Sequence, residues 1–255
     1  MAEPRFDLRG KRALVVGASG GIGAAIARAL AQSGMDLALA GRSMERLSRI
    51  RAEADPAGQR SVAIEVDVRD ERSVNDAVGT AIDQLGGLDV VVAASGVSPI
   101  YKSAERISVE EWDEIFATNT RGAFLVARAA GQHMLERREG SIIFVTSIYE
   151  RVGGERLAAY AASKGAVSQL VRSLALEWAS RGVRGNCNAP GYVRTHLTAG
   201  LQSNPELLTL IEMSTPLGRM ATPDEIAGAA IYLASDAASY VTGSTLFVDG
   251  GWTAR

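Results

Sequence analysis

The sequence predicts an α/β fold: a doubly wound parallel sheet of about seven strands with helices packed on both faces. Short apolar segments alternate with longer amphipathic ones along the whole chain. Several of the apolar segments are continuously hydrophobic, which is typical of strands buried on both faces of a parallel sheet. Because a helical pattern follows most of the strands, right-handed crossovers would place helices on both sides of the sheet.

The expected elements follow from these patterns of side chains. The strands are rich in β-branched and aliphatic residues and cover Arg12–Val16, Leu37–Ala40, Val62–Val66, Val90–Ala94, Ser141–Thr146, Val183–Cys187 and Thr245–Val248. The helices carry apolar side chains on one face and cover Ile22–Ser33, Met44–Ala54, Glu71–Leu85, Val109–Glu136, Ala158–Ser180 and Pro223–Ala234.

The organisation of the chain is that of one unit. No long linker, low-complexity tract or change of composition divides its 255 residues, so we expect a single domain over residues 1–255. The one long stretch without a clear element is Pro190–Thr222, which further prolines interrupt. Stretches of this length in a compact domain are usually functional, so we predict a substrate loop or lid at about 190–222.

Composition and charge exclude several classes of function. A formal net charge of −2 and the lack of any Lys/Arg-rich run offer no surface for nucleic acid. No apolar run reaches the ~18 residues that a membrane span needs, and the N-terminus is too polar for a secretion signal. The one cysteine, Cys187, cannot form an internal disulfide or a thiolate metal cluster. We expect a cytoplasmic protein that binds no nucleic acid, membrane or metal.

A glycine-rich segment lies between the first expected strand and the first expected helix. Gly17 permits a tight turn, and Gly21 and Gly23 let backbone and helix approach closely, so that a pyrophosphate can lie at the helix N-terminus. Glycine clusters also form plain turns, but here a strand precedes and a helix follows, as a Rossmann-type nucleotide site demands. The contacts we predict from this loop are Gly17, Ser19, Gly21, Ile22 and Gly23.

A second pattern, formed by Ser147, Tyr160 and Lys164, suits proton transfer. Tyr160 and Lys164 are four residues apart on an expected helix, so both side chains project from one face. Ser147 stands at the carboxyl end of a strand, where open α/β sheets bind their ligands. A Tyr and a Lys at this spacing are usually a surface pair, and Ser147 alone could cap a strand. Behind a dinucleotide loop, however, the three together point to catalysis.

These residue types match the chemistry of carbonyl reduction. Hydride transfer to a ketone must be accompanied by a proton for the oxygen. A free tyrosine titrates near ~10, and a neighbouring ammonium lowers that pKa. We therefore expect Tyr160 to be the general acid in reduction and the general base in oxidation. Lys164 would lower the pKa of Tyr160, and Ser147 would hydrogen-bond the substrate oxygen.

With a G-x-x-x-G-x-G loop, Ser147 and the Tyr-x-x-x-Lys set at 160–164, the sequence resembles the short, single-domain branch of the short-chain dehydrogenase/reductase family. The resemblance covers Leu8–Gly251. It implies an oxidoreductase that moves a hydride between NADP(H) or NAD(H) and a carbonyl or secondary alcohol, and a homotetramer or homodimer. It adds Asn119 to the catalytic set, as the holder of a water that relays protons, although Asn119 could also be a mid-helix kink residue.

The cofactor preference depends on the residues after the second strand. In this fold an acidic residue there binds the 2′-hydroxyl of NAD, whereas a basic one can pair with the 2′-phosphate of NADP. No carboxylate stands there, and Arg42 is placed to bind a phosphate, although it could be an ordinary solvated residue. We favour NADP(H), with NAD(H) as the alternative. The resemblance implies further cofactor contacts at Asp67, Val68, Ser95, Gly96, Asn119, Tyr160, Lys164, Pro190, Gly191, Val193 and Thr195.

The substrate is less well defined by the sequence. We predict substrate contacts at Ser147, Tyr149, Glu150, Tyr160 and Tyr192, and a polar pocket rim. Glu150 and Arg151 could equally form a surface or subunit-contact pair. A keto sugar acid and a 3-oxoacyl thioester are both compatible substrates.

Two other classes of function fit the sequence less well than an oxidoreductase. A catalytically silent NADP-binding regulator would be expected to lack the Tyr/Lys pair, which this chain has. A nucleotide-sugar epimerase or dehydratase would generally be longer and would carry a separate substrate domain.

Overall fold

The computed structural model describes residues 5–55, 57–58 and 60–254. It contains a seven-stranded parallel sheet in the order β3-β2-β1-β4-β5-β6-β7. The strands are β1 (Arg12–Val16), β2 (Asp36–Gly41), β3 (Ser61–Glu65), β4 (Val90–Ala93), β5 (Gly140–Val145), β6 (Val183–Pro190) and β7 (Thr245–Val248). The chain builds outward from β1 to β3 and then returns to place β4 on the other side of β1. The predicted doubly wound fold is therefore confirmed.

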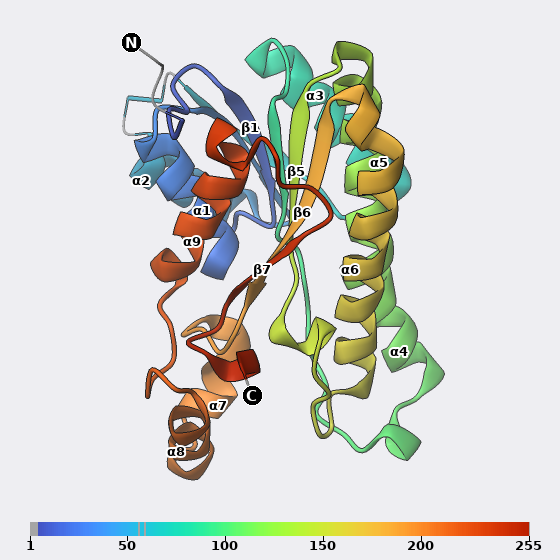
Figure 1. Ribbon diagram of the computed structural model, residues 1–255, viewed down its shortest axis with the longest axis vertical. Helices are drawn as coiled ribbons and strands as arrows, with labels where there is room; N and C mark the ends of the chain where they lie inside the picture. The colour runs from blue at the N-terminus through green and yellow to red at the C-terminus, as the bar shows by residue number, and fades with distance from the viewer. Residues whose placement is uncertain (1–4, 56, 59, 255) are drawn as a thin grey trace.

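Helices cover both faces of the sheet (Figure 1). One face packs against α1 (Gly21–Gln32), α2 (Met44–Ala54) and α9 (Pro223–Ala234), and the other against α3 (Glu71–Leu85), α5 (Gly122–Arg137) and α6 (Ala158–Trp178). Within the described ranges, no helix is both long and apolar enough to cross a membrane.

Two separate cores explain the continuously apolar strands. Along β1, Leu14 and Val16 enter the core under α3 and α5, whereas Ala13 and Val15 enter the core under α1 and α9. Because successive side chains of a strand point to opposite faces, a strand that supplies both cores needs apolar residues at every position.

Most elements lie where the sequence predicts them, but the predicted helix Val109–Glu136 is not one regular α-helix. It consists of α4 (Val109–Phe116), a π-helical stretch over Ala117–Arg121, and α5. The capping box of Ser108 and Glu111 starts α4 where the apolar pattern begins. The wider π-helical turn lies around Asn119, and single π-helical turns within α-helices are frequent at functional sites.

The stretch Pro190–Thr222 is not without regular structure. It contains α7 (Ala199–Gln202) and α8 (Pro205–Ser214), which lie at the end of the molecule where the strands finish (Figure 1). Pro205 does not break a helix here but begins one, because the first turn has no use for its missing N–H. The side chain of Asn204 caps that turn by accepting hydrogen bonds from two backbone N–H groups.

The core beneath β5 provides a test of the packing. Phe144 on β5 is 1% exposed and is among the largest fully buried side chains of the described chain. Phe144→Ala should lower the free energy of unfolding by about 3–5 kcal/mol, because it removes apolar contact and leaves a cavity. Phe6→Ala is the matched control: Phe6 is 59% exposed, so we expect a loss of about 1 kcal/mol or less. Urea unfolding of the two variants would contradict this packing if both lost the same stability.

Candidate active site

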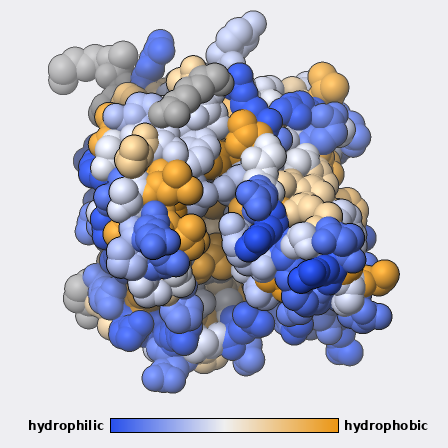
Figure 2. Space-filling view, turned by 90° about the horizontal axis from the view of Figure 1, so that it is seen from below, coloured by the Kyte–Doolittle hydropathy of each residue, from blue (hydrophilic) through white to orange (hydrophobic). Residues whose placement is uncertain are grey.

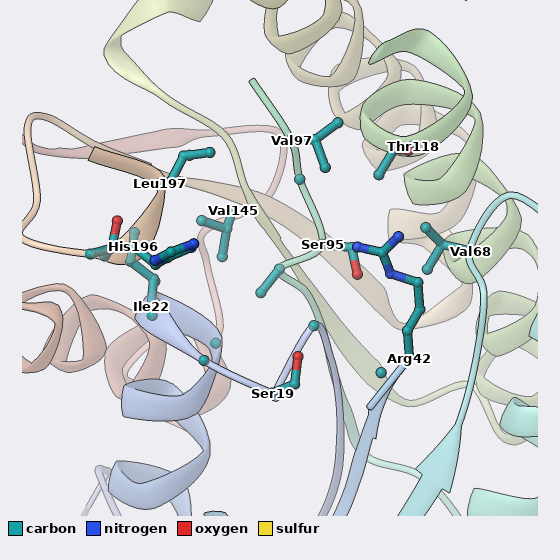
Figure 3. Close-up of a pocket in the computed structure, with 18 of the residues that line it drawn as sticks. Ser19, Ile22, Arg42, Val68, Ser95, Val97, Thr118, Val145, His196 and Leu197 are labelled. Carbon is teal, nitrogen blue, oxygen red and sulfur yellow. The ribbon is translucent and has the colours of Figure 1, made fainter. Parts of the chain in front are cut away.

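A pocket of about 330 Å³ opens at the carboxyl ends of the central strands. Figure 2 looks onto this end of the molecule and shows a hollow with apolar residues at its border. The pocket lining comes from the glycine-rich loop, the ends of β2 to β5, α6 and the segment after β6. Figure 3 shows Ser19 and Ile22 on the glycine-rich side, Arg42 and Val68 at one end, and His196 at the other.

The glycine-rich loop forms the floor of this pocket through two close approaches. Gly17 has a φ of 92°, and a Cβ there would lie 2.7 Å from the backbone nitrogen of Ser95. A Cβ at Gly23 would lie 2.2 Å from the carbonyl oxygen of Gly17. Side chains at these two positions are therefore excluded. Helix α1 begins at Gly21 without a side-chain cap and without an acidic residue in its first turn, so its N–H groups suit an anion.

The end of β2 makes one corner of the pocket basic. Arg42 projects into the pocket near Val68 (Figure 3), and Arg46 and Arg69 also line it. The nearby carboxylate, Asp67, is held in an ion pair with Arg69 at 2.6 Å. The hydrogen bond from Arg69 lowers the pKa of Asp67 to about 2. The charge of Asp67 is thus compensated, and Arg42 gives this corner a positive charge that suits a phosphate.

Ser147 and Tyr160 are brought together as the sequence predicts. Ser147 lies just beyond β5, is 7% exposed, and accepts a hydrogen bond from the N–H of Tyr149 at 3.3 Å. Its side chain also lies close to the phenol of Tyr160, in the first turn of α6. Burial raises the pKa of Tyr160, and the neighbouring Ser147 side chain opposes that shift. The net direction favours the protonated phenol.

Lys164 lies one turn further along α6 and is 5% exposed. Its Nζ donates a hydrogen bond to the carbonyl oxygen of Val145 at 2.9 Å and lies 5.8 Å from the centre of the Tyr160 ring. Burial lowers the pKa of Lys164 to about 8. We expected Lys164 to lower the pKa of Tyr160, but the net shift of Tyr160 is upward because burial dominates it.

Asn119 is 1% exposed and lies in the π-helical stretch. Its Nδ2 donates to the carbonyl oxygen of Val97 at 2.9 Å and to Oγ of Ser163 at 3.0 Å, and its Oδ1 accepts from the N–H of Val97 at 2.8 Å. The side-chain amide therefore joins the segment after β4 to α6. These bonds use both N–H donors of the amide and one acceptor position of its oxygen, and the binding of a relay water by Asn119 stays a prediction.

The side chain of Glu150 is bound to β7. Its Oε1 accepts a hydrogen bond from Oγ1 of Thr245 on β7 at 2.7 Å, and its Oε2 is buried without a hydrogen-bond partner. Arg151 instead stacks over the ring of Phe247 at 5.5 Å. The two side chains thus form no ion pair with each other, and the substrate contact of Glu150 stays a prediction.

Of the other predicted cofactor contacts, some line the pocket and some do not. The lining includes Gly17, Ser19, Gly21, Ile22, Gly23, Arg42, Asp67, Val68, Ser95, Gly96 and Thr195. Pro190, Gly191 and Val193 are not part of it: Pro190 ends β6, and Val193 is buried and pairs with Ala221. His196, which we expected only at a polar pocket rim, also lines the pocket, and Leu197 beside it was missed because both belong to a short turn that the sequence pattern does not reveal.

Two predicted substrate contacts, Tyr149 and Tyr192, lie together beside Tyr160. The ring of Tyr149 meets that of Tyr160 edge-on at 6.2 Å, and the hydroxyl groups of Tyr149 and Tyr192 are 2.5 Å apart. Trp252 extends this group, since its ring lies 4.9 Å from that of Tyr192. We missed Trp252 because no sequence pattern connects the last residues of the chain with the segment after β6.

Comparison with known proteins places this geometry in a family. The family model described as enoyl-(acyl carrier protein) reductase matches residues 17–253. The chain is 40% identical to 3beta-hydroxysteroid dehydrogenase 1 of Eggerthella lenta over 249 residues, which covers 97% of this chain and 95% of that protein.

Two solved structures are similar throughout. One is a short-chain type dehydrogenase/reductase from Mycobacterium marinum, with 36% identity, a TM-score of 0.93 and 98% of each chain covered. The other is a gluconate 5-dehydrogenase from Burkholderia cenocepacia J2315 in complex with NADP and tartrate, with 34% identity, a TM-score of 0.94 and 98% of each chain covered. Likeness of this extent means that the chain belongs to the short-chain dehydrogenase/reductase family and is an NAD(P)-dependent oxidoreductase.

Proposed function

We propose that this oxidoreductase transfers a hydride between NADP(H) and a carbonyl or secondary alcohol, with Tyr160 as the group that gives and takes the proton. The observation that carries the proposal is the grouping around the Tyr160 phenol: the Ser147 side chain lies close to it, and Nζ of Lys164 is 5.8 Å from the centre of its ring. Tyr160 and Lys164 line a pocket that begins at the N-terminus of α1. A proton donor beside a dinucleotide site is the combination that carbonyl reduction requires.

The pocket fits a dinucleotide with a 2′-phosphate. The first turn of α1 would hold the diphosphate, Arg42 with Ser19 would hold the 2′-phosphate, and Val68 would pack against the adenine. Bound there, the nicotinamide would supply or accept the hydride. The similar gluconate 5-dehydrogenase, solved with NADP, supports the same preference, and NAD(H) is the alternative. Thr195, which contacts the start of α1, would close the diphosphate site.

The protein groups have distinct parts in the proposed reaction. Tyr160 would protonate the substrate oxygen in reduction and remove the hydroxyl proton in oxidation. Ser147 would donate a hydrogen bond to the same oxygen and stabilise the charge that develops on it. Lys164 would favour the phenolate through its positive charge and would also bind the ribose of the cofactor. Asn119 fixes the pocket wall at Val97 against α6, and through that wall it would keep Lys164 in position.

Alternative functions have less support. The comparisons do not support a catalytically silent NADP-binding regulator, because the similar proteins from Eggerthella lenta and Burkholderia cenocepacia are named as dehydrogenases. For the substrate, a polar keto sugar acid agrees with the gluconate 5-dehydrogenase, and a 3-oxoacyl thioester agrees with the description of the family model. A substrate segment at 190–222, a homotetramer or homodimer, and a cytoplasmic location are further proposals from the sequence.

Tyr160→Phe tests the catalytic assignment. Removal of the hydroxyl group takes away the proton donor but leaves the ring, so kcat for carbonyl reduction should fall about 10²–10⁴-fold. NADPH binding, followed by fluorescence, should stay close to that of the wild type. Tyr240→Phe is the matched control, because Tyr240 is fully exposed and lies outside the pocket. Near-wild-type turnover in Tyr160→Phe would remove the basis of the proposed mechanism.

Arg42→Ala tests the cofactor preference. Loss of a charge-assisted contact with the 2′-phosphate should raise Kd for NADPH about 10–100-fold and leave Kd for NADH unchanged. Arg49→Ala, an exposed arginine on α2 outside the pocket, should change neither constant. If Arg42→Ala weakened the binding of NADPH and of NADH equally, Arg42 would have no contact with the 2′-phosphate.

Lys164→Met tests whether the buried ammonium is kept for function at a cost in stability. In the unfolded chain Lys164 stays protonated to pH ~10, whereas in the folded protein its pKa is about 8. The unfolded state therefore binds more protons between these values, and wild-type stability should rise with pH across this interval. The variant should be more stable than wild type by ~1–3 kcal/mol below pH 8, with the difference shrinking toward pH 10.

Urea unfolding at pH about 7 and about 9.5 measures that difference. Lys102→Met, at an exposed lysine, controls for the loss of a charge. A stability gain in Lys164→Met that grew as the pH rose would contradict the assigned protonation.

A further inference from the structure

Three aromatic side chains continue from Tyr160 toward the C-terminus, and we call Tyr149, Tyr192 and Trp252 the aromatic wall. Each ring meets the next edge-on: Tyr160 and Tyr149 at 6.2 Å, Tyr149 and Tyr192 at 6.4 Å, and Tyr192 and Trp252 at 4.9 Å. All three rings are partly exposed. They come from three distant segments of the chain, namely the turn after β5, the segment after β6 and the turn after β7. A ligand whose oxygen reaches Tyr160 would therefore have this wall beside it.

The two phenols of the wall bond to each other. The hydroxyl groups of Tyr149 and Tyr192 share a hydrogen bond of 2.5 Å. Burial raises the pKa of both phenols, so the wall is uncharged at neutral pH. Beside the second hydroxyl proton and the indole N–H, the wall offers a ligand ring surface, which favours the burial of apolar area.

The arginines that flank the wall along the chain are engaged elsewhere. Arg151 stacks on the ring of Phe247, and Arg194 pairs with Glu212 at 3.6 Å. Arg156 stacks over the ring of Tyr101 at 5.6 Å and lies 3.7 Å from Glu155. Among the described arginines nearest the wall in sequence, none is therefore left to pair with a carboxylate seated against it, and such a carboxylate would lose hydration without that compensation.

We propose that the aromatic wall binds the carbon ring of an uncharged cyclic ketone or secondary alcohol whose oxygen lies at Tyr160, rather than a sugar acid or an open-chain acyl group. The inference rests on the proposed function and narrows its substrate class. A saturated ring presents a broad apolar face to the three side chains. It also has few rotatable bonds to immobilise, whereas a flexible acyl chain would lose conformational entropy on being ordered.

The test compares four carbonyl compounds with NADPH: decalone, an open-chain decanone, a keto sugar acid and a β-ketoacyl thioester. In the wild type we expect kcat/KM for decalone to exceed each of the others at least tenfold. Trp252→Ala should lower kcat/KM for decalone about tenfold and leave that for decanone near its wild-type value. Trp252→Phe, which keeps a ring, should restore most of the preference.

Trp112→Ala is the matched control, because Trp112 lies on α4 and stacks on Phe116 rather than on the wall. It should leave the ratio of decalone to decanone unchanged, so a general loss of packing cannot imitate the effect of Trp252→Ala.

The outcomes separate the inference from the proposed function. Faster reduction of the sugar acid, the thioester or decanone than of decalone overturns the substrate class and leaves the hydride transfer intact. An equal loss for all substrates in Trp252→Ala also overturns it, because the wall would then have no part in selection. If the wild type binds NADPH but reduces none of the four compounds, the proposed function fails and the inference fails with it.

Discussion

The contact between the start of α1 and the end of β1 is the constraint on which the rest of the site depends. With only 2.2 Å between the Gly17 carbonyl oxygen and the position of a Cβ at Gly23, α1 can pack here only if residue 23 has no side chain. The same turn brings Gly17 against the backbone of Ser95 after β4. Because β2 and β4 lie on opposite sides of β1, this turn opens the crevice at the point where the strand order reverses.

Around that crevice, hydrogen bonds between elements fix the groups to which we assign catalysis. Lys164 of α6 is tied to the last residue of β5, Val145, and Asn119 ties the segment after β4 to α6. Ser147 accepts a hydrogen bond from the backbone that follows it, and its side chain lies close to the Tyr160 phenol. The positions of these side chains thus follow from the register of β4 and β5, which pair along their length. Such placement by regular elements keeps a site in its working geometry.

Local patterns were sufficient to predict the sheet, most helices and the Ser–Tyr–Lys set, because strand burial, the glycine spacing and the i, i+4 relation are properties of neighbouring residues. Part of the remainder depends on contacts between distant residues, because the partner of Glu150, Thr245, lies on β7, and Trp252 meets Tyr192 from another segment. Another part is local, because a proline can interrupt a helix or begin one. At α8 the capping side chain of Asn204 makes Pro205 the start of a helix. The sequence alone does not distinguish a proline that interrupts a helix from one that begins it.

Burial acts on the two central titratable groups in the same sense, because it favours the neutral form of each. It raises the pKa of the Tyr160 phenol and lowers that of the Lys164 ammonium to about 8. Burial alone thus makes Tyr160 a weaker acid, so in the proposed reaction a positive charge near the phenol is needed to favour the phenolate. Below pH 8 Lys164 carries such a charge. Because reduction and oxidation pass through the same transition state, Lys164 would favour the phenolate in both directions, and its loss should slow both.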